Sequence, residues 1–248
     1  MRPLGSRSAH RTLAGVFLDL LCCHCLLRVP WSATAASRLV PEVLRQSAEE
    51  LGLYFGPHVP DGPEGHGAAG RQQLRSIRTE LARRPSEDIP CPPDRNRLGT
   101  ARAARAALVR LCSAADGTPH TAWLRSAAPL LLNELASLEL EFGGGLGPIP
   151  YHRPATALAE RRALVVAAGA CTETWLAASA EASAARTDAP SAFLADPVWL
   201  TGVLQRTVVR LGTTPLPGPV PDVAATATAE VLERCAQGRR FDLYGTPL

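Results

Sequence analysis

The chain has 248 residues, of which 46% are hydrophobic and 20% charged, and its formal net charge at pH 7 is +3. This apolar content is too high for a disordered chain, and the length is sufficient for one or two domains with a hydrophobic core. All 26 basic residues are arginine, and they are interspersed with acidic residues. Because they form no basic stripe, we expect no nucleic-acid partner.

The first 37 residues allow two interpretations. Three early arginines, an apolar stretch over 13–27 and an A-x-A sequence at 33–35 are typical of a secretory signal. Asp19 and His24 interrupt that stretch, however, and they fit the polar face of an amphipathic helix, which is the interpretation we favour. Its apolar positions at helical spacing are Leu13, Val16, Phe17, Leu20, Leu21 and Leu27. No uninterrupted apolar run reaches about 18 residues, so we expect no membrane span.

The remaining pattern predicts helices and no strands. A short, strongly charged segment lies at 71–84, between a Gly/Pro/His loop and a proline-rich linker. Pro197 marks the true first turn of one helix, Asp222 caps the last helix, and glycines at 143–145 and 238 are stop signals. No segment of more than four residues alternates convincingly, so the predicted fold class is all-α. The segments with helical periodicity are 37–55, 97–112, 121–142, 155–186, 192–211 and 223–237.

Side chains that could carry chemistry are scattered. The seven cysteines include a crowded group at 22–25 without zinc-ligand spacing, so we expect free, buried thiols in a reducing compartment. The six histidines form no i,i+4 pair, so no metal site is predicted. Helical carboxylates such as Glu134, Glu139 and Glu141 are interpreted as solvated faces, and the glycines at 143–147 as the end of a helix. No serine-hydrolase elbow is present.

One block of the sequence is similar to a known family. Residues 37–76, SRLVPEVLRQSAEELGLYFGPHVPDGPEGHGAAGRQQLRS, resemble the C-terminal helical domain of actinobacterial acyl-CoA dehydrogenases. The upstream stretch RTLAGVFLDLLCCHCLL is similar to the preceding helix of that domain. The tail, from FLADPVWLTG to the end of the chain, resembles a C-terminal extension of the same subfamily. The resemblance therefore predicts a helical bundle of this type over 1–84, a linker over 85–96 and a helical extension over 97–248.

The resemblance also implies a chemistry. Members of the family oxidise acyl-CoA to enoyl-CoA: a glutamate removes a proton and the flavin of FAD accepts a hydride. It implies Gly56 and Arg75 as cofactor-binding positions. A glycine-rich loop of the family is replaced here by Gly56-Pro57, and proline removes a backbone donor. Glu80 is the carboxylate nearest to the expected base but lies in a charged helical setting, so no catalytic residue is assigned.

The family carries two further domains before this one, which hold most of the FAD and acyl-CoA pocket. We therefore expect a flavoprotein-like chain that is truncated or a separate subunit, and that does not bind FAD or catalyse alone. The expected partner is a homo-oligomer or a full-length dehydrogenase subunit, in the cytoplasm. The alternatives are a non-catalytic helical interaction subunit and, third, a secreted helical protein released near residue 35.

Overall fold

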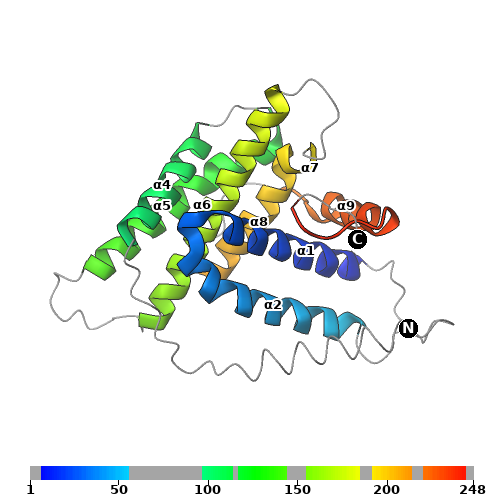
Figure 1. Cartoon of the computed structure of the whole chain (residues 1–248), viewed down its shortest axis with the longest axis horizontal. Coiled ribbons are helices and arrows are strands. Elements are labelled where there is room, and N and C mark those ends of the chain that lie inside the picture. Colours follow the sequence, from blue (N-terminus) through cyan, green and yellow to red (C-terminus); the bar gives the residue numbers. More distant parts are fainter. Residues whose placement is uncertain are drawn as a thin grey trace.

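The computed structural model describes residues 7–55, 97–113, 117–143, 155–184, 192–213 and 220–243. Within these ranges the chain is all-α, as predicted, and it contains no strand. Figure 1 shows the helices gathered around the long α6. The elements are α1 (Arg7–Arg28), the 3₁₀ turn η1 (Pro30–Ser32), α2 (Ala33–Phe55), α4 (Arg97–Cys112), α5 (Pro119–Gly143), α6 (Ala155–Ala184), α7 (Ala192–Ala195), α8 (Pro197–Leu211) and α9 (Ala224–Ala236).

The helices α1 and α2 form an antiparallel hairpin (Figure 1). The turn between them is closed by Ser32, whose hydroxyl is buried and donates to the backbone oxygens of Leu26 at 2.5 Å and Val29 at 2.6 Å. This turn lets α2 begin at Ala33, four residues before the predicted start at Ser37. A side chain that satisfies the carbonyls at a helix end fixes the direction in which the chain leaves that helix.

One hydrophobic core joins this hairpin to the rest of the described chain. The helix α6 packs against α1, α2, α4, α5, α7 and α8, while α9 packs against α1. The core cluster draws buried side chains from both sides of the predicted linker. The division into a domain over 1–84 and an extension over 97–248 stays a prediction, but the described helices of both share this core. Its largest fully buried apolar side chains are Trp199, Leu21, Leu26, Leu108, Leu111, Leu124, Leu131, Leu135, Leu138, Leu200 and Leu204.

Local capping explains where several helices begin and end. Pro197 starts α8, as predicted, and the Asp196 carboxylate accepts a hydrogen bond from the Val198 amide at 2.8 Å. Asp222, the predicted cap of α9, accepts from the Ala224 amide at 2.9 Å, but the residue at the N-cap position is Val223, whose side chain makes no capping hydrogen bond. Gly212 and Gly238 follow α8 and α9 with φ of 61° and 59°, the left-handed conformation that ends helices and that glycine tolerates best.

The start of α5 lies two residues before its prediction. Thr118 and Thr121 form a reciprocal cap in which each hydroxyl accepts from the other's backbone amide at 3.1 Å. Pro119 then occupies the first turn, where its missing N–H costs nothing. The prediction placed the start at Thr121 because the apolar periodicity begins there, whereas the cap sits outside that periodicity.

Two expectations about α1 are wrong. Asp19, assigned to a polar face, is 2% exposed, and Leu27, assigned to the apolar face, is 66% exposed. The helix is covered by α2, α6, α8 and α9, so almost its whole circumference is buried and a single apolar stripe does not describe it. Asp19 is tolerated in the core because it finds charged partners on α8.

Two of the described helices have the length and hydropathy of membrane-crossing segments: Ser8–Arg28 and Ala155–Ala184. The sequence expectation rested on uninterrupted apolar runs, and both helices contain polar residues within an apolar average. In the structure 61% of each apolar window is buried inside the bundle. The core helix of a helical bundle can have the same length and hydropathy as a membrane-spanning helix, so these two properties do not distinguish them.

Candidate functional site

The residues assigned by resemblance lie outside the part of the chain that the structure describes. Gly56 and Arg75, the implied cofactor-binding positions, both fall within 56–96, as does Glu80. Their assignment stays a prediction. The helix α2, which leads to Gly56, ends at Phe55.

The most constrained polar group in the described residues is a cluster at the crossing of α1 and α8. Asp19 of α1 receives Arg206 in a bidentate arrangement, with Nε 2.9 Å from Oδ1 and Nη2 2.5 Å from Oδ2. Arg210, one turn further along α8, donates from Nη2 to the same Oδ2 at 2.8 Å. The carboxylate side chain is only 3% exposed, while those of Arg206 and Arg210 are 28% and 22% exposed.

The rim of this cluster is supplied by α2. The Glu50 carboxylate lies 3.6 Å from Arg206 Nη2, and the Gln46 side-chain oxygen lies 3.5 Å from Arg210 Nη2. Burial would lower the pKa of Arg206, but hydrogen bonds to Asp19 and the charges of Asp19 and Glu50 outweigh it and raise that pKa above its ordinary value. Arg206 is therefore held in its charged form, and α1, α2 and α8 meet around the cluster.

The backbone makes room for this ion pair. A Cβ placed on Gly15 of α1 would lie 2.6 Å from Arg206 Nη1, a distance that real Cβ atoms essentially never show. Glycine at this position therefore lets the guanidinium group lie against α1 and reach Asp19. Both carboxylate oxygens accept hydrogen bonds from arginine, so the arrangement fastens helices together and does not present a free oxygen to a substrate.

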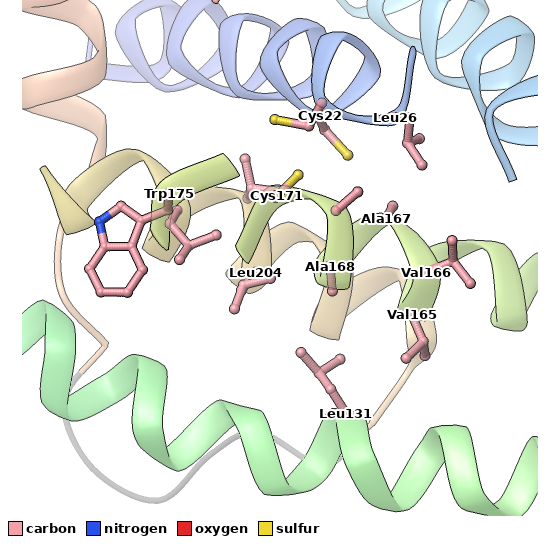
Figure 2. Close-up of a cluster of buried hydrophobic side chains, with 14 of the residues drawn as sticks. Cys22, Leu26, Leu131, Val165, Val166, Ala167, Ala168, Cys171, Trp175 and Leu204 are labelled. Atoms are coloured by element: carbon pink, nitrogen blue, oxygen red, sulfur yellow. The ribbon is translucent and has the colours of Figure 1, made fainter. Parts of the chain in front are cut away.

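A second group of side chains is made of thiols. Cys22 and Cys25 are about one turn apart on α1, and both belong with Cys171 of α6 to the same buried core cluster where the two helices pack together. Figure 2 shows Cys22 across the helix interface from Cys171, with Leu26, Ala167, Ala168 and Leu204 nearby. The hydrogen bonds to the two other thiols, followed by burial, hold the pKa of Cys171 well above its ordinary value. Because a neutral thiol is a poor nucleophile, Cys171 is unreactive in the folded bundle.

The other described cysteines are Cys23, Cys112 and Cys235. The pKa of Cys23 is raised chiefly by burial and next by the neighbouring Cys22, with the charge of Asp19 as a smaller cause. Cys112 is half-buried and Cys235 is exposed. The expectation of free thiols holds for the six described cysteines, whereas the expectation of burial is wrong for Cys235.

A pocket of about 310 Å³ lies where η1 meets α6. Its polar lining is already engaged in part: Glu173 forms an ion pair with Arg110 of α4, and Thr174 donates to the backbone oxygen of Ala170 at 3.0 Å. The remaining lining is mostly small or apolar. The lining residues are Arg28, Val29, Pro30, Trp31, Glu173, Thr174, Ala177, Ala178, Glu181 and Leu194.

Several carboxylates that the sequence assigned to solvated faces hold helices together. Glu134 of α5 accepts from Arg161 Nε of α6 at 2.6 Å, and Arg161 also donates to the Leu211 backbone oxygen at the end of α8. Glu139 of α5 pairs with Arg105 of α4. Sequence spacing within one helix contains no information about partners on another helix, which is why these pairs were missed.

Arg234 is a further residue that the sequence did not single out. It is 2% exposed, it donates from Nε to Glu230 at 2.6 Å, and it donates to the backbone oxygen of Asp242. Its guanidinium carbon lies 5.1 Å from the ring centroid of Phe17 and 5.4 Å from that of Phe193. Arg234 therefore attaches the C-terminal segment to α1 and α7 by charge–π contacts as well as hydrogen bonds.

Within the described ranges, no group of three or more His, Cys, Asp or Glu side chains has an arrangement that could hold a metal ion. Comparison with known proteins finds no matching family model, no similar curated protein and no similar solved structure. The candidate site thus consists of the Asp19 cluster, the three thiols and the neighbouring pocket, all of which involve α1 or the turn that follows it.

Proposed function

We propose that this chain is an acyl-CoA dehydrogenase-like helical polypeptide that acts in the cytoplasm as a non-catalytic partner of a complete flavoenzyme. In this proposal its described helices correspond to the family's C-terminal helical bundle followed by a helical extension. FAD would be bound mainly by the partner, and Gly56 and Arg75 would contribute from this chain. The family reaction would take place on the partner's base and flavin.

The observation that carries the proposal is the continuous core between the α1–α2 hairpin and α6, α8 and α9. The hairpin contains the segments that resemble the family, and Asp19 fastens it to α8 by three arginine hydrogen bonds. A polypeptide with its own core can fold and persist as a separate subunit. This favours a subunit over a remnant that cannot fold.

Secretion would require α1 to be lost. The A-x-A sequence at 33–35 lies at the start of α2, so cleavage there would remove the whole of α1 with its buried Phe17, Leu18 and Leu21. It would also leave Arg206 and Arg210 without Asp19. We therefore prefer the cytoplasmic proposal to the secreted alternative.

Co-expression tests the proposal. The full chain is produced alone and together with the flavin-binding polypeptide encoded beside its gene, and both preparations are examined by visible absorption and by acyl-CoA-dependent dye reduction. We expect a colourless protein alone, and a yellow, active complex containing both chains. A stoichiometric flavin on the chain alone, or the absence of a complex with a folded flavin-binding polypeptide, would contradict the proposal.

A further inference from the structure

The three thiols between α1 and α6 have a chemical property that the proposed function does not use. Cys22, Cys25 and Cys171 are 7%, 0% and 0% exposed and belong to the same buried core cluster where α1 packs against α6 (Figure 2). They come from helices that are far apart in the sequence, so a bond between them would connect the α1–α2 hairpin covalently to α6. Formation of the bond requires two of the sulfur atoms to approach to about 2.05 Å.

We propose that Cys171 forms a disulfide with Cys22 or Cys25 when the protein meets a peroxide, and that this bond locks α1 onto α6. Hydrogen peroxide first oxidises one thiol to a sulfenic acid, R–SOH, and releases one water. The second thiol then attacks the sulfenic sulfur, the S–S bond forms, and a second water leaves. Two thiols and one peroxide thus give one disulfide and two waters.

Burial determines when this reaction happens. The thiols are almost fully covered, so peroxide reaches them only when α1 separates from α6. The third thiol remains beside the bond and can exchange with it, which allows both pairings with Cys171. Oxidation is therefore slow under native conditions and faster in urea, which makes the bond a response to strong or prolonged oxidation.

The neighbouring cysteines provide internal controls. Cys23 is on the same helix and 4% exposed, but it is not among the groups that act on Cys171, whereas Asp19 and Arg210 are among those that act on Cys23. Cys235 is exposed and distant in the sequence from the three thiols. Oxidation without regard to position would modify the exposed Cys235 first and would link Cys23 as often as Cys22 or Cys25. The proposed reaction links Cys171 to Cys22 or Cys25 and leaves Cys23 unlinked.

Peptide mapping of the full chain tests the proposal. The protein is treated with hydrogen peroxide, with and without urea below the unfolding transition, blocked with iodoacetamide and digested with trypsin without reduction. Cleavage at arginine places Cys22, Cys23 and Cys25 in residues 12–28 and Cys171 in residues 163–186. We expect these two peptides to be linked, with fragmentation assigning the bond to Cys22 or Cys25, and the linked fraction to rise severalfold in urea.

Variants separate the proposed bond from incidental oxidation. Cys235→Ser and Cys23→Ala should leave the linked peptide unchanged, and Cys171→Ala should abolish it. If a substitution at a buried cysteine prevents folding, the peptides of the oxidised wild-type protein still show whether the bond forms. Complete oxidation of Cys235 with no link between residues 12–28 and 163–186, or a link through Cys23, would overturn the proposal.

Discussion

Replacing Asp19 with asparagine should destabilise the bundle strongly, because it removes the buried negative charge that two arginines share. The side chain keeps its size, so the change tests charge and hydrogen bonding instead of packing. In the variant, the amide oxygen can still accept one arginine hydrogen bond, whereas the amide NH₂ faces donors. Apart from that one hydrogen bond, Arg206 and Arg210 would keep the more distant contacts with Glu50 and Gln46 on α2.

The size of the effect follows from burial. Removing one partner of a fully buried ion pair typically costs about 3–5 kcal/mol, because an uncompensated charge stays in the core. Here the arginine side chains are 28% and 22% exposed and can regain some hydration. We therefore expect Asp19→Asn to lower the free energy of unfolding by about 2–4 kcal/mol.

Urea unfolding followed by circular dichroism measures this difference. Glu42→Gln is the matched control, because it removes a carboxylate that pairs with Arg45 at 2.6 Å while both side chains are 38–47% exposed. That exposed pair should be worth less than about 1 kcal/mol. Replacing Asp19, Arg206 and Arg210 together with leucine and methionines should recover much of the loss, since a buried ion pair often contributes little over apolar packing. Equal small losses for Asp19→Asn and the control would refute the reasoning.

Three further predictions concern packing, pH and the C-terminus. Gly169→Ala should lower the free energy of unfolding by about 1–3 kcal/mol, because the new Cβ would lie 2.8 Å from the Cα of Ala104. At Gly52 a Cβ meets nothing within 4 Å, so Gly52→Ala should raise the free energy of unfolding by about 0.5–1 kcal/mol. Urea titrations that change both free energies in the same direction would contradict this. Burial raises the pKa of the Cys23 thiol in the folded state. Above pH 9.0, the ordinary thiol pKa, only the unfolded state therefore loses the proton, and the free energy of unfolding should fall as the pH rises. Cys23→Ala should make this fall less steep, and an equally steep fall in the variant would show that Cys23 is not its cause. Arg234→Met should release the C-terminal segment and speed tryptic cleavage there, while an unchanged digestion pattern would show that the charge–π contacts do not hold it.

Periodicity and capping signals were sufficient to predict most of the described helices. The helix over 97–112 matches α4 at both ends, and Pro197, Asp222 and Gly238 act where local chemistry places them. These features depend on residues within a few positions of one another. The helix boundary at Ala33 was missed because it depends on the Ser32 hydroxyl reaching back to α1.

The candidate site was not predictable in the same way. Asp19 looked like a surface residue because its partners, Arg206 and Arg210, are 187 and 191 residues away in a chain of 248. Cys22 and Cys25 lacked the spacing of a local motif, and their partner Cys171 is on another helix. Contacts between distant helices depend on how the helices pack, and a single sequence shows this packing only as a general excess of apolar residues.

The helix α1 is an integral part of the hydrophobic core that the described helices share. The four largest buried apolar side chains of α1 are Phe17, Leu18, Leu21 and Leu26, each at most 2% exposed. At about 1.5–3 kcal/mol each they account for about 6–12 kcal/mol, which is comparable to the total stability of a typical domain.

The most direct measurement is therefore the unfolding of a chain shortened to residues 36–248, compared with the full chain by circular dichroism and calorimetry. We predict a cooperative transition for the full chain and none for the shortened chain, which should expose its core and aggregate. A shortened chain that unfolds cooperatively with near-native helix content would contradict the account and would favour release of α1.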